Sequence, residues 1–181
     1  MKYLNLLFIF LIISCSTEKK VTIVGDATSP RITFGVKKLS ETLSDKGYIV
    51  AVADKVSKEN KNQIIVVSVK NDANKKESFQ IATSNKTISI AGSDASGALY
   101  GALELADRIK ETGNIPSEIT FKDSPEMVLR GTCIGLQKTK YLEGRGVYEY
   151  PYTPENFPWF YDKELWIQYL DMMVENRLNS L

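Results

Sequence analysis

Residues 87–110 constrain the fold of this chain more than any other stretch, because they join a β-branched run to a helix that begins with small residues. The run ends in a Gly-Ser-Asp turn, and Gly97, Ala98, Gly101 and Ala102 follow within the first two turns of the helix. A glycine inside a helix costs about 1 kcal/mol relative to alanine, so two of them indicate a packing or functional need. We predict that the backbone of this helix lies very close to a sheet.

The turn before this helix has the glycine spacing of a phosphate-binding loop, from Gly92 to Gly97, but lacks the Lys-Ser/Thr pair that would follow. A carboxylate at a helix N-terminus would also repel phosphate. We therefore interpret Asp94, or Ser93, as the cap of the helix.

The periodicity of the first 124 residues predicts an α/β fold, a small sandwich in which a sheet carries its helices on one face. Apolar residues recur at spacings of four, three and four in residues 32–43, which is one face of a helix. The apolar run 64–67 is typical of a strand covered on both faces. The expected order is β-α-β-β-β-β-α-β, with strands at 21–24, 48–52, 64–69, 78–83, 87–91 and 119–122, one helix at 30–45, and the small-residue helix ending near residue 112.

The strand, turn and helix of residues 87–110 resemble a unit of the small α/β domain that precedes the catalytic barrel in several glycoside hydrolases. These include the family 20 β-hexosaminidases and the family 67 α-glucuronidases. The resemblance implies that residues 21–124 form an α/β accessory domain. It also implies a carbohydrate, an oligosaccharide or polysaccharide, as the substrate.

Residues 125–181 differ in character from the preceding domain. Residues 128–134 predict a strand, Asp162 can cap a helix that runs through Arg177, and residues 180–181 look like the start of another strand. The helix is expected to bury a stripe formed by Leu165, Trp166, Tyr169, Leu170 and Met173. This order resembles the first β/α unit of a (β/α)8 (TIM) barrel. Because one such unit lacks its neighbouring strands, we expect the chain to be a fragment of a larger enzyme.

The segment between that strand and helix, residues 135–161, is longer than most loops and rich in aromatic side chains. In a barrel it would leave the carboxyl end of the first strand, on the face where active sites form. Tyrosine and tryptophan can stack on sugar rings while their polar atoms bond to hydroxyls. Tyr150 and Trp159 are therefore candidate substrate contacts, although any single aromatic side chain could instead pack the loop onto the barrel rim.

Arg130 is the third candidate substrate contact. Leu129-Arg130-Gly131 resembles, in position, the start of the first barrel strand in family 20 enzymes, and the resemblance implies an arginine that grips hydroxyls of the terminal sugar. A guanidinium has five donors in a fixed fork, suited to vicinal hydroxyls or to a uronate carboxylate. The alternative is an arginine paired with a carboxylate elsewhere in the barrel. Residues 132–137 depart from the family pattern, which favours a sister family.

Residues 1–14 have the pattern of a signal peptide, a basic residue followed by an apolar run too short to span a bilayer. The run ends in Ile-Ile-Ser-Cys, which resembles the lipobox of bacterial lipoproteins. Cys15 is thus the candidate lipidation site and residues 15–20 a tether; the alternative is an ordinary thiol beside a conventional cleavage site. Lipidation would anchor the protein to a membrane of the cell envelope, in the periplasm or at the cell surface.

Composition excludes several classes of function. Without residues 1–14 the chain loses one of its 23 basic residues and none of its 22 acidic residues, and a neutral surface argues against a nucleic-acid partner. The chain has no histidine, which removes His-dependent nucleophile systems and most metal sites, so we expect no metal and no cofactor. In the families that the chain resembles, the catalytic acids lie on later barrel strands, so we assign no catalytic residue. The carboxylates near the expected active-site face are interpreted as capping or surface groups: Glu143, Glu149, Glu155, Asp162 and Glu164.

Two functions follow from these expectations. The first is the N-terminal fragment of a lipid-anchored glycoside hydrolase, hexosaminidase-like or glucuronidase-like, that hydrolyses O-glycosyl bonds in complex glycans. On this reading the 181-residue segment alone is inactive. The alternative is a non-catalytic surface lipoprotein that binds glycan through the α/β domain and the aromatic loop.

Overall fold

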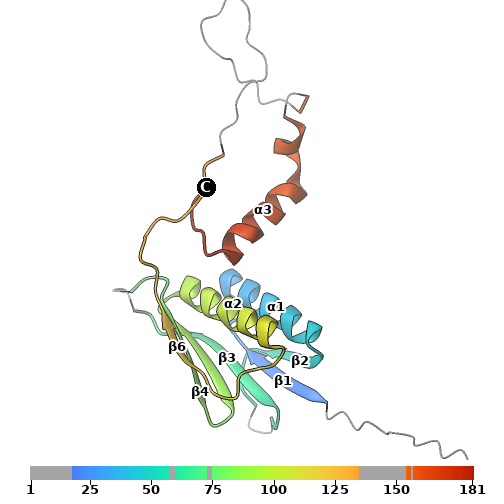
Figure 1. Cartoon of the computed structure of the whole chain (residues 1–181), viewed down its shortest axis with the longest axis vertical. Coiled ribbons are helices and arrows are strands. Elements are labelled where there is room, and N and C mark those ends of the chain that lie inside the picture. Colours follow the sequence, from blue (N-terminus) through green and yellow to red (C-terminus); the bar gives the residue numbers. More distant parts are fainter. Residues whose placement is uncertain (1–17, 58–59, 73–74, 135–153, 156) are drawn as a thin grey trace, which may run out of the picture.

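The computed structural model describes residues 18–57, 60–72, 75–134, 154–155 and 157–181. Its main body, residues 19–123, is a six-stranded sheet with two helices, which we call the sheet domain (Figure 1). The elements are β1 (Lys19–Val24), α1 (Pro30–Asp45), β2 (Tyr48–Ala53), β3 (Gln63–Val69), β4 (Phe79–Ser84), β5 (Thr87–Gly92), α2 (Ala95–Thr112), β6 (Thr120–Asp123), the 3₁₀ helix η1 (Pro158–Tyr161) and α3 (Lys163–Glu175). The predicted order of strands and helices up to residue 123 is confirmed. The largest shift is in β1, which begins at Lys19 instead of residue 21.

The sheet has the strand order β2-β1-β3-β5-β4-β6. Strands β1, β2, β3 and β5 are parallel, whereas β4 runs antiparallel to both of its neighbours. Asn85 and Lys86 join β4 to β5 with φ angles of 47° and 66°, the backbone of a tight two-residue turn. The predicted α/β fold is therefore confirmed as a mixed sheet with one opposed strand.

The hydrophobic core lies between the two helices and one face of the sheet. Alternate residues of the strands point to that face, so Ile23, Ile65 and Ile90 are fully buried. Leu39 of α1 and Leu105 of α2 close the core from the other side. Both helices lie side by side on the same face of the sheet (Figure 1), which confirms the predicted sandwich.

Helix α2 lies as close to the sheet as its small residues predict. A Cβ atom on Gly97 would stand 2.1 Å from the carbonyl oxygen of Ser78, and one on Gly101 would stand 2.5 Å from Cγ2 of Ile90. Real Cβ atoms do not approach other atoms so closely, so any larger residue at Gly97 must displace α2. The two glycines therefore fix the distance between helix and sheet.

Asp94 is the N-cap of α2, as predicted. Its Oδ1 accepts from the backbone N–H of Gly97 at 2.8 Å, and its Oδ2 accepts from the backbone N–H of Glu77 at 2.9 Å. The hydroxyl of Ser93 accepts from the backbone N–H of Ser78 at 3.1 Å. The same turn thus caps the helix and binds the segment that enters β4.

The prediction that both faces of β3 are covered is wrong in its detail. Ile65 and Val67 are 0% and 3% exposed, but Ile64 and Val66, on the face without helices, are only half-buried. An apolar run shows that each side chain can be buried, not which element covers it.

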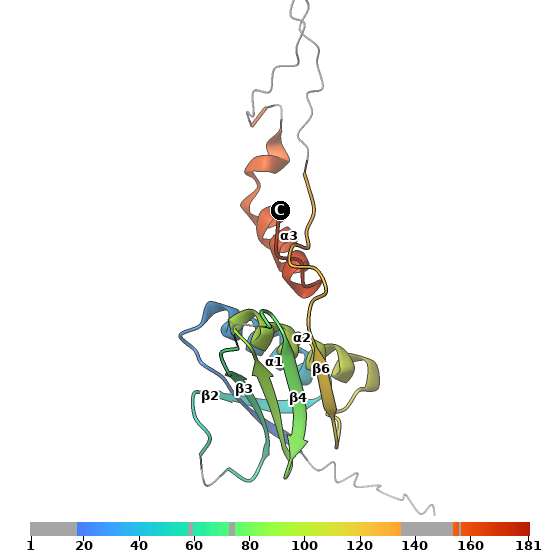
Figure 2. The ribbon, with the colours of Figure 1, turned by 90° about the vertical axis from the view of Figure 1, so that its left-hand side faces the viewer.

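We call residues 124–181 the tail, and its described part extends away from the sheet domain (Figure 2). A strand was expected at 128–134, yet among the described residues of the tail only Gly131 forms a β-bridge, parallel to Ser180. The backbone N–H of Thr132 donates to the oxygen of Ser180 at 3.2 Å. The pairing is parallel, as expected for a barrel. It is one bridge long, and the described residues offer no second strand to pair with residues 128–134 on their other side.

Helix α3 confirms the predicted cap and corrects the predicted buried stripe. Oδ1 of Asp162 accepts from the backbone N–H groups of Glu164 and Leu165, at 3.0 and 3.2 Å. Of the stripe, only Met173 is buried, at 4% exposed, whereas Leu165 and Leu170 are 37% and 47% exposed. Among the described residues, only the C-terminal end of α3 approaches the sheet domain and η1 contacts its first turns, so Leu165 and Leu170 stay exposed (Figures 1 and 2).

Candidate functional site

Two of the four predicted site residues lie among the residues that the structure describes. The structure describes Arg130 and Trp159, while Tyr150 and Cys15 lie outside the described residues. No helix among the described residues is long and apolar enough to span a membrane.

Arg130 is held by groups of both the tail and the sheet domain. Its Nη2 lies 2.7 Å from Oε2 of Glu77 in the segment before β4. Its Nε donates to the carbonyl oxygen of Arg177 at 2.9 Å, and its Nη1 donates to that of Met127 at 2.7 Å. The arginine is therefore paired with a carboxylate, as in the alternative interpretation, but the carboxylate belongs to the sheet domain. A sugar contact by Arg130 stays a prediction.

The electrostatics of this pair follow from its burial. The side chains of Arg130 and Glu77 are only 15% and 19% exposed. Burial disfavours the charge of Arg130, but the hydrogen bond and the charge of Glu77 outweigh it and raise the pKa of the guanidinium. Burial, together with the charge of Glu77, also raises the pKa of Tyr100, whose ring lies 5.9 Å from the guanidinium. The guanidinium of Arg130 is thus largely screened from water and held in its charged form.

A second arginine, Arg177, lies beside the first. Its Nη1 is 2.9 Å from Oδ2 of Asp123, and its Nη2 pairs with Glu104. The guanidinium stands 5.5 Å from the centre of the Phe79 ring. A cavity of about 260 Å³ lies between the two arginines, lined by Glu77, Phe79, Tyr100, Asp123, Ser124, Pro125, Arg130, Asn176 and Arg177.

Trp159 belongs to an aromatic cluster at the start of α3. Its ring centre lies 6.1 Å from those of Phe160 and Trp166. Nε1 of Trp166 donates to the carbonyl oxygen of Phe160 at 2.7 Å, which fixes η1 against the first turn of the helix. Trp159 itself is 37% exposed. An exposed indole on a rigid support can stack on a sugar ring.

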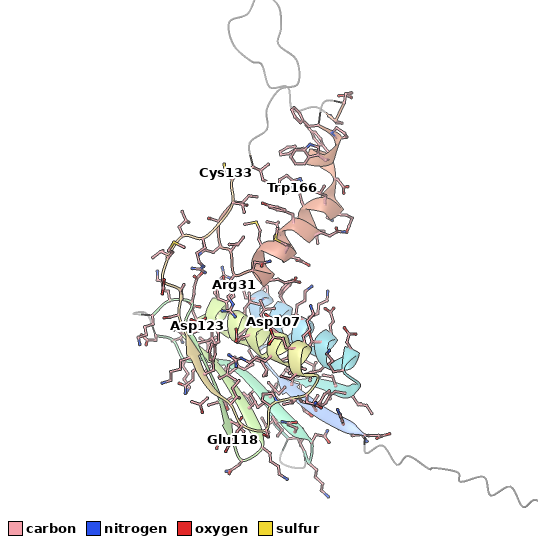
Figure 3. All side chains as sticks on the ribbon, in the orientation of Figure 1. Arg31, Asp107, Glu118, Asp123, Cys133 and Trp166 are labelled. Carbon is pink, nitrogen blue, oxygen red and sulfur yellow. The ribbon has the colours of Figure 1, made fainter. Side chains whose placement is uncertain are left out.

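Arg130 and Trp159 lie at opposite ends of α3. Arg130 contacts Arg177, just after the helix, whereas Trp159 contacts Trp166 in its first turns. A helix of 13 residues is about 20 Å long. In Figure 3, Asp123 lies beside the sheet and Trp166 lies at the far part of α3. The structure therefore does not bring the two predicted contacts into one pocket.

Sequence reasoning missed Glu77 and Arg177, which hold Arg130. Glu77 lies in the segment before a predicted strand and Arg177 at the end of a predicted helix, and no motif marks either residue. Within the described ranges, no group of three or more carboxylate or cysteine side chains could hold a metal ion.

Known proteins resemble the chain in both its sequence and its fold. The family model described as glycosyl hydrolase family 20, domain 2, matches residues 14–123. A solved structure of a GH138 enzyme targeting pectin rhamnogalacturonan II has 46% sequence identity and a TM-score of 0.77, and the match covers 90% of this chain and 23% of that enzyme. No curated protein matches the chain.

Two more distant structures show the same fold. CpGH84D has 14% identity and a TM-score of 0.52, with 62% of this chain and 21% of that protein covered. A family GH115 4-O-methyl-α-glucuronidase with specificity for decorated arabinogalactans has 20% identity and a TM-score of 0.52, with 63% and 19% covered. The chain spans less than a quarter of the length of each of these three proteins.

Proposed function

Because the chain belongs to the family described as glycosyl hydrolase family 20, domain 2, we propose that it is the N-terminal part of a glycoside hydrolase. Residues 21–124 form the accessory domain in this proposal. Residues 125–181 form the first β/α unit of a catalytic barrel that further chain completes. The exposed apolar face of α3 is the surface that such a barrel would cover.

The observation that carries the proposal is the 46% identity with the GH138 enzyme. That match covers 90% of the chain, whereas the family model covers residues 14–123 only. The match must therefore include much of the tail. Because the chain covers 23% of that enzyme, a complete barrel fits in the remaining length.

The same match supports an acidic glycan as the substrate. The GH138 enzyme is described as targeting pectin rhamnogalacturonan II. A guanidinium such as that of Arg130 suits a uronate carboxylate, a group that N-acetylhexosamines lack. Of the hexosaminidase-like and glucuronidase-like activities, we therefore propose one that cleaves beside a uronate. Arg130, Tyr150 and Trp159 remain the candidate substrate contacts.

Lipid anchoring through Cys15 is part of the proposal, with the enzyme in the cell envelope. It rests on the apolar run and the Ile-Ile-Ser-Cys sequence of residues 12–15. A Cys15→Ser variant is expected to lose the incorporation of radiolabelled fatty acid and to leave the membrane fraction. Incorporation that is unchanged in Cys15→Ser would contradict the anchor.

The activity is tested with the whole protein that carries this chain, incubated with rhamnogalacturonan II oligosaccharides and, separately, with an aryl β-N-acetylhexosaminide. We expect release of a uronate from the first and no product from the second. Trp159→Ala should lower kcat/KM about tenfold, the effect of one lost stacking contact, while Trp159→Phe retains a ring and most of the activity. Sugar binding without any hydrolysis would instead favour the non-catalytic glycan-binding lipoprotein.

A further inference from the structure

Two arginines of the tail meet three carboxylates of the sheet domain where the two regions join. Arg130 pairs with Glu77, and Arg177 pairs with Asp123 and Glu104. We propose that these five residues form an ionic joint that docks the tail on the sheet domain in one orientation, and that their side chains rather than apolar contacts determine that orientation. The joint concerns docking alone, so it does not depend on which glycan the whole protein cleaves.

Apolar contact at this surface is confined to the C-terminal end of α3. Val128 and Leu129, which directly precede Arg130, are 89% and 73% exposed. From α3, Met173 is buried and Val174 packs against the core of the sheet domain. The ion pairs, by contrast, occur at both ends of the contact, before the bridge of Gly131 and after α3.

The backbone at two of the joint residues supports a requirement for their side chains. Glu77 and Arg177 have φ angles of 60° and 57°, in the left-handed region. This region is uncommon for residues other than glycine, asparagine and aspartate. Glycine adopts it without steric cost. The chain instead carries long charged side chains at both positions, and both side chains enter the joint.

The position of Glu77 is fixed from the sheet domain. Its backbone N–H donates to Oδ2 of Asp94, the residue that caps α2. The side chain of Glu77 is thereby held beside the start of α2, where Arg130 reaches it at 2.7 Å. A pre-positioned carboxylate loses little conformational freedom when it binds a guanidinium, which strengthens the pair.

The joint also fixes the first pairing between the two strand segments of the tail. The carbonyl oxygen of Arg130 accepts from the backbone N–H groups of Asn179 and Ser180, at 2.7 and 3.1 Å. The side-chain oxygen of Asn179 accepts from the backbone N–H of Arg130 at 2.9 Å. The residue that binds Glu77 is therefore also the residue that sets the register beside the bridge from Gly131 to Ser180. Docking and strand register are coupled through Arg130.

The test replaces the left-handed residues of the joint with glycine in the 181-residue chain, as Glu77→Gly and Arg177→Gly. The matched control is Lys86→Gly, an exposed residue with φ of 66° in the turn between β4 and β5. Hydrogen exchange is measured on residues 127–134 and 176–180 and, in the same molecules, on β5. If the side chains of Glu77 and Arg177 did not contribute to docking, glycine at these positions would leave amide hydrogen exchange unchanged or make it slower. In both joint variants we expect roughly tenfold faster exchange in the tail and unchanged exchange in β5. In the Lys86→Gly control we expect exchange to be unchanged in both regions.

Tail exchange that is the same in Glu77→Gly, Arg177→Gly and Lys86→Gly would overturn the joint. If a glycine variant also speeds the exchange of β5, the sheet domain itself has loosened, and the isosteric Glu77→Gln decides the question. That variant keeps the side-chain size and removes only the charge. Faster exchange confined to the tail of Glu77→Gln supports the proposal, and an unchanged tail contradicts it.

Discussion

The sheet domain and the tail carry similar apolar patterns but reach different states of burial. In the sheet domain, Ile88 and Leu105 are fully buried. In the tail, Val128 and Leu129 are 89% and 73% exposed, although they stand in a run that reads as a strand. The difference lies in the partners within reach. Every strand of the sheet domain pairs with another strand of that domain, whereas the described residues of the tail form one bridge.

An apolar pattern becomes buried only where another element of the fold can cover it. The helix pair α1 and α2 covers one face of the sheet and completes a core. Helix α3 has a comparable stripe, but among the described residues only its C-terminal end reaches the sheet domain, so Leu165 and Leu170 stay exposed. The sheet domain closes a hydrophobic core of its own, whereas the described part of the tail leaves most of its apolar side chains exposed.

The sharpest test of the comparison removes one leucine from each region. Leu105→Ala should lower the free energy of unfolding by about 3–5 kcal/mol, because it leaves a cavity in a closed core. Leu129→Ala should change it by less than about 0.5 kcal/mol, because the side chain is largely in water. Denaturant unfolding of both variants measures the difference, and equal losses would break the distinction between the two regions.

The next largest effect concerns the contact between helix and sheet. Gly97→Ala should cost about 3 kcal/mol, because its methyl group would meet the backbone oxygen of Ser78 and α2 would have to shift. Gly35→Ala in α1 is the control, since its nearest neighbours, Cβ of Ala102 and Cδ1 of Leu99, stand at 3.1 and 3.2 Å, so a methyl group there requires a much smaller shift than at Gly97. Thermal melting of the two variants compares them. A Gly97→Ala protein as stable as Gly35→Ala would show that the close approach is not needed.

Loss of a helix cap should differ between the regions by a smaller amount. Asp94→Ala removes acceptors for the backbone N–H groups of Gly97 and Glu77, so we expect a loss of about 1–2 kcal/mol. Asp162→Ala removes the cap of α3, which stands mostly outside the core, and should leave the melting of the sheet domain unchanged. Helicity by circular dichroism follows α3 in the same samples. A sheet domain that melts earlier in Asp162→Ala would contradict the separation.

The smallest predicted effect is a loosening of α3 at alkaline pH. Nζ of Lys38 lies 2.7 Å from Oε1 of Glu175, and that bond raises the pKa of Lys38 above its ordinary value of 10.5. A raised pKa means that the pair stabilises the fold fully below about pH 10.5 and that this contribution is lost as the pH rises through the folded-state pKa.

Because both side chains are partly exposed, we expect this contribution to be no more than about 0.5 kcal/mol. Exchange at the backbone N–H of Asn176, compared between pH 8 and pH 11 conditions, should rise more in the natural chain than in Lys38→Met. Tyr100 titrates in both proteins, so the comparison removes its effect. An identical pH response in the two proteins would show that the ion pair of Lys38 and Glu175 does not stabilise α3.

Local signals in the sequence were enough to predict most of the sheet domain. Periodicity gave the order of its elements, and the small residues Gly97 and Gly101 predicted the close approach of α2. The cap at Asp94 could also be predicted, because a carboxylate at the start of a helix usually accepts hydrogen bonds from the first backbone N–H groups. These features depend on neighbours a few residues away.

The site was less predictable, because its contacts join distant residues. Arg130 was selected from its place in the sequence, but its partner Glu77 lies 53 residues earlier. The left-handed backbone of Glu77 and Arg177 leaves no mark in residue type, since glycine is the usual signal for it. The strand at 128–134 and the stripe of α3 were overestimated because their pattern implies partners that the described tail does not offer.

The intact mass of the native polypeptide, determined on protein isolated from its source cells, decides whether further chain covers the tail. A tail that needs further chain predicts a product about four times as long as these 181 residues, since the chain covers 23% of the GH138 enzyme. That product should carry a lipid on Cys15. A mass that matches 181 residues or its processed form would contradict the account, because no barrel could then cover Val128, Leu129 and the apolar face of α3.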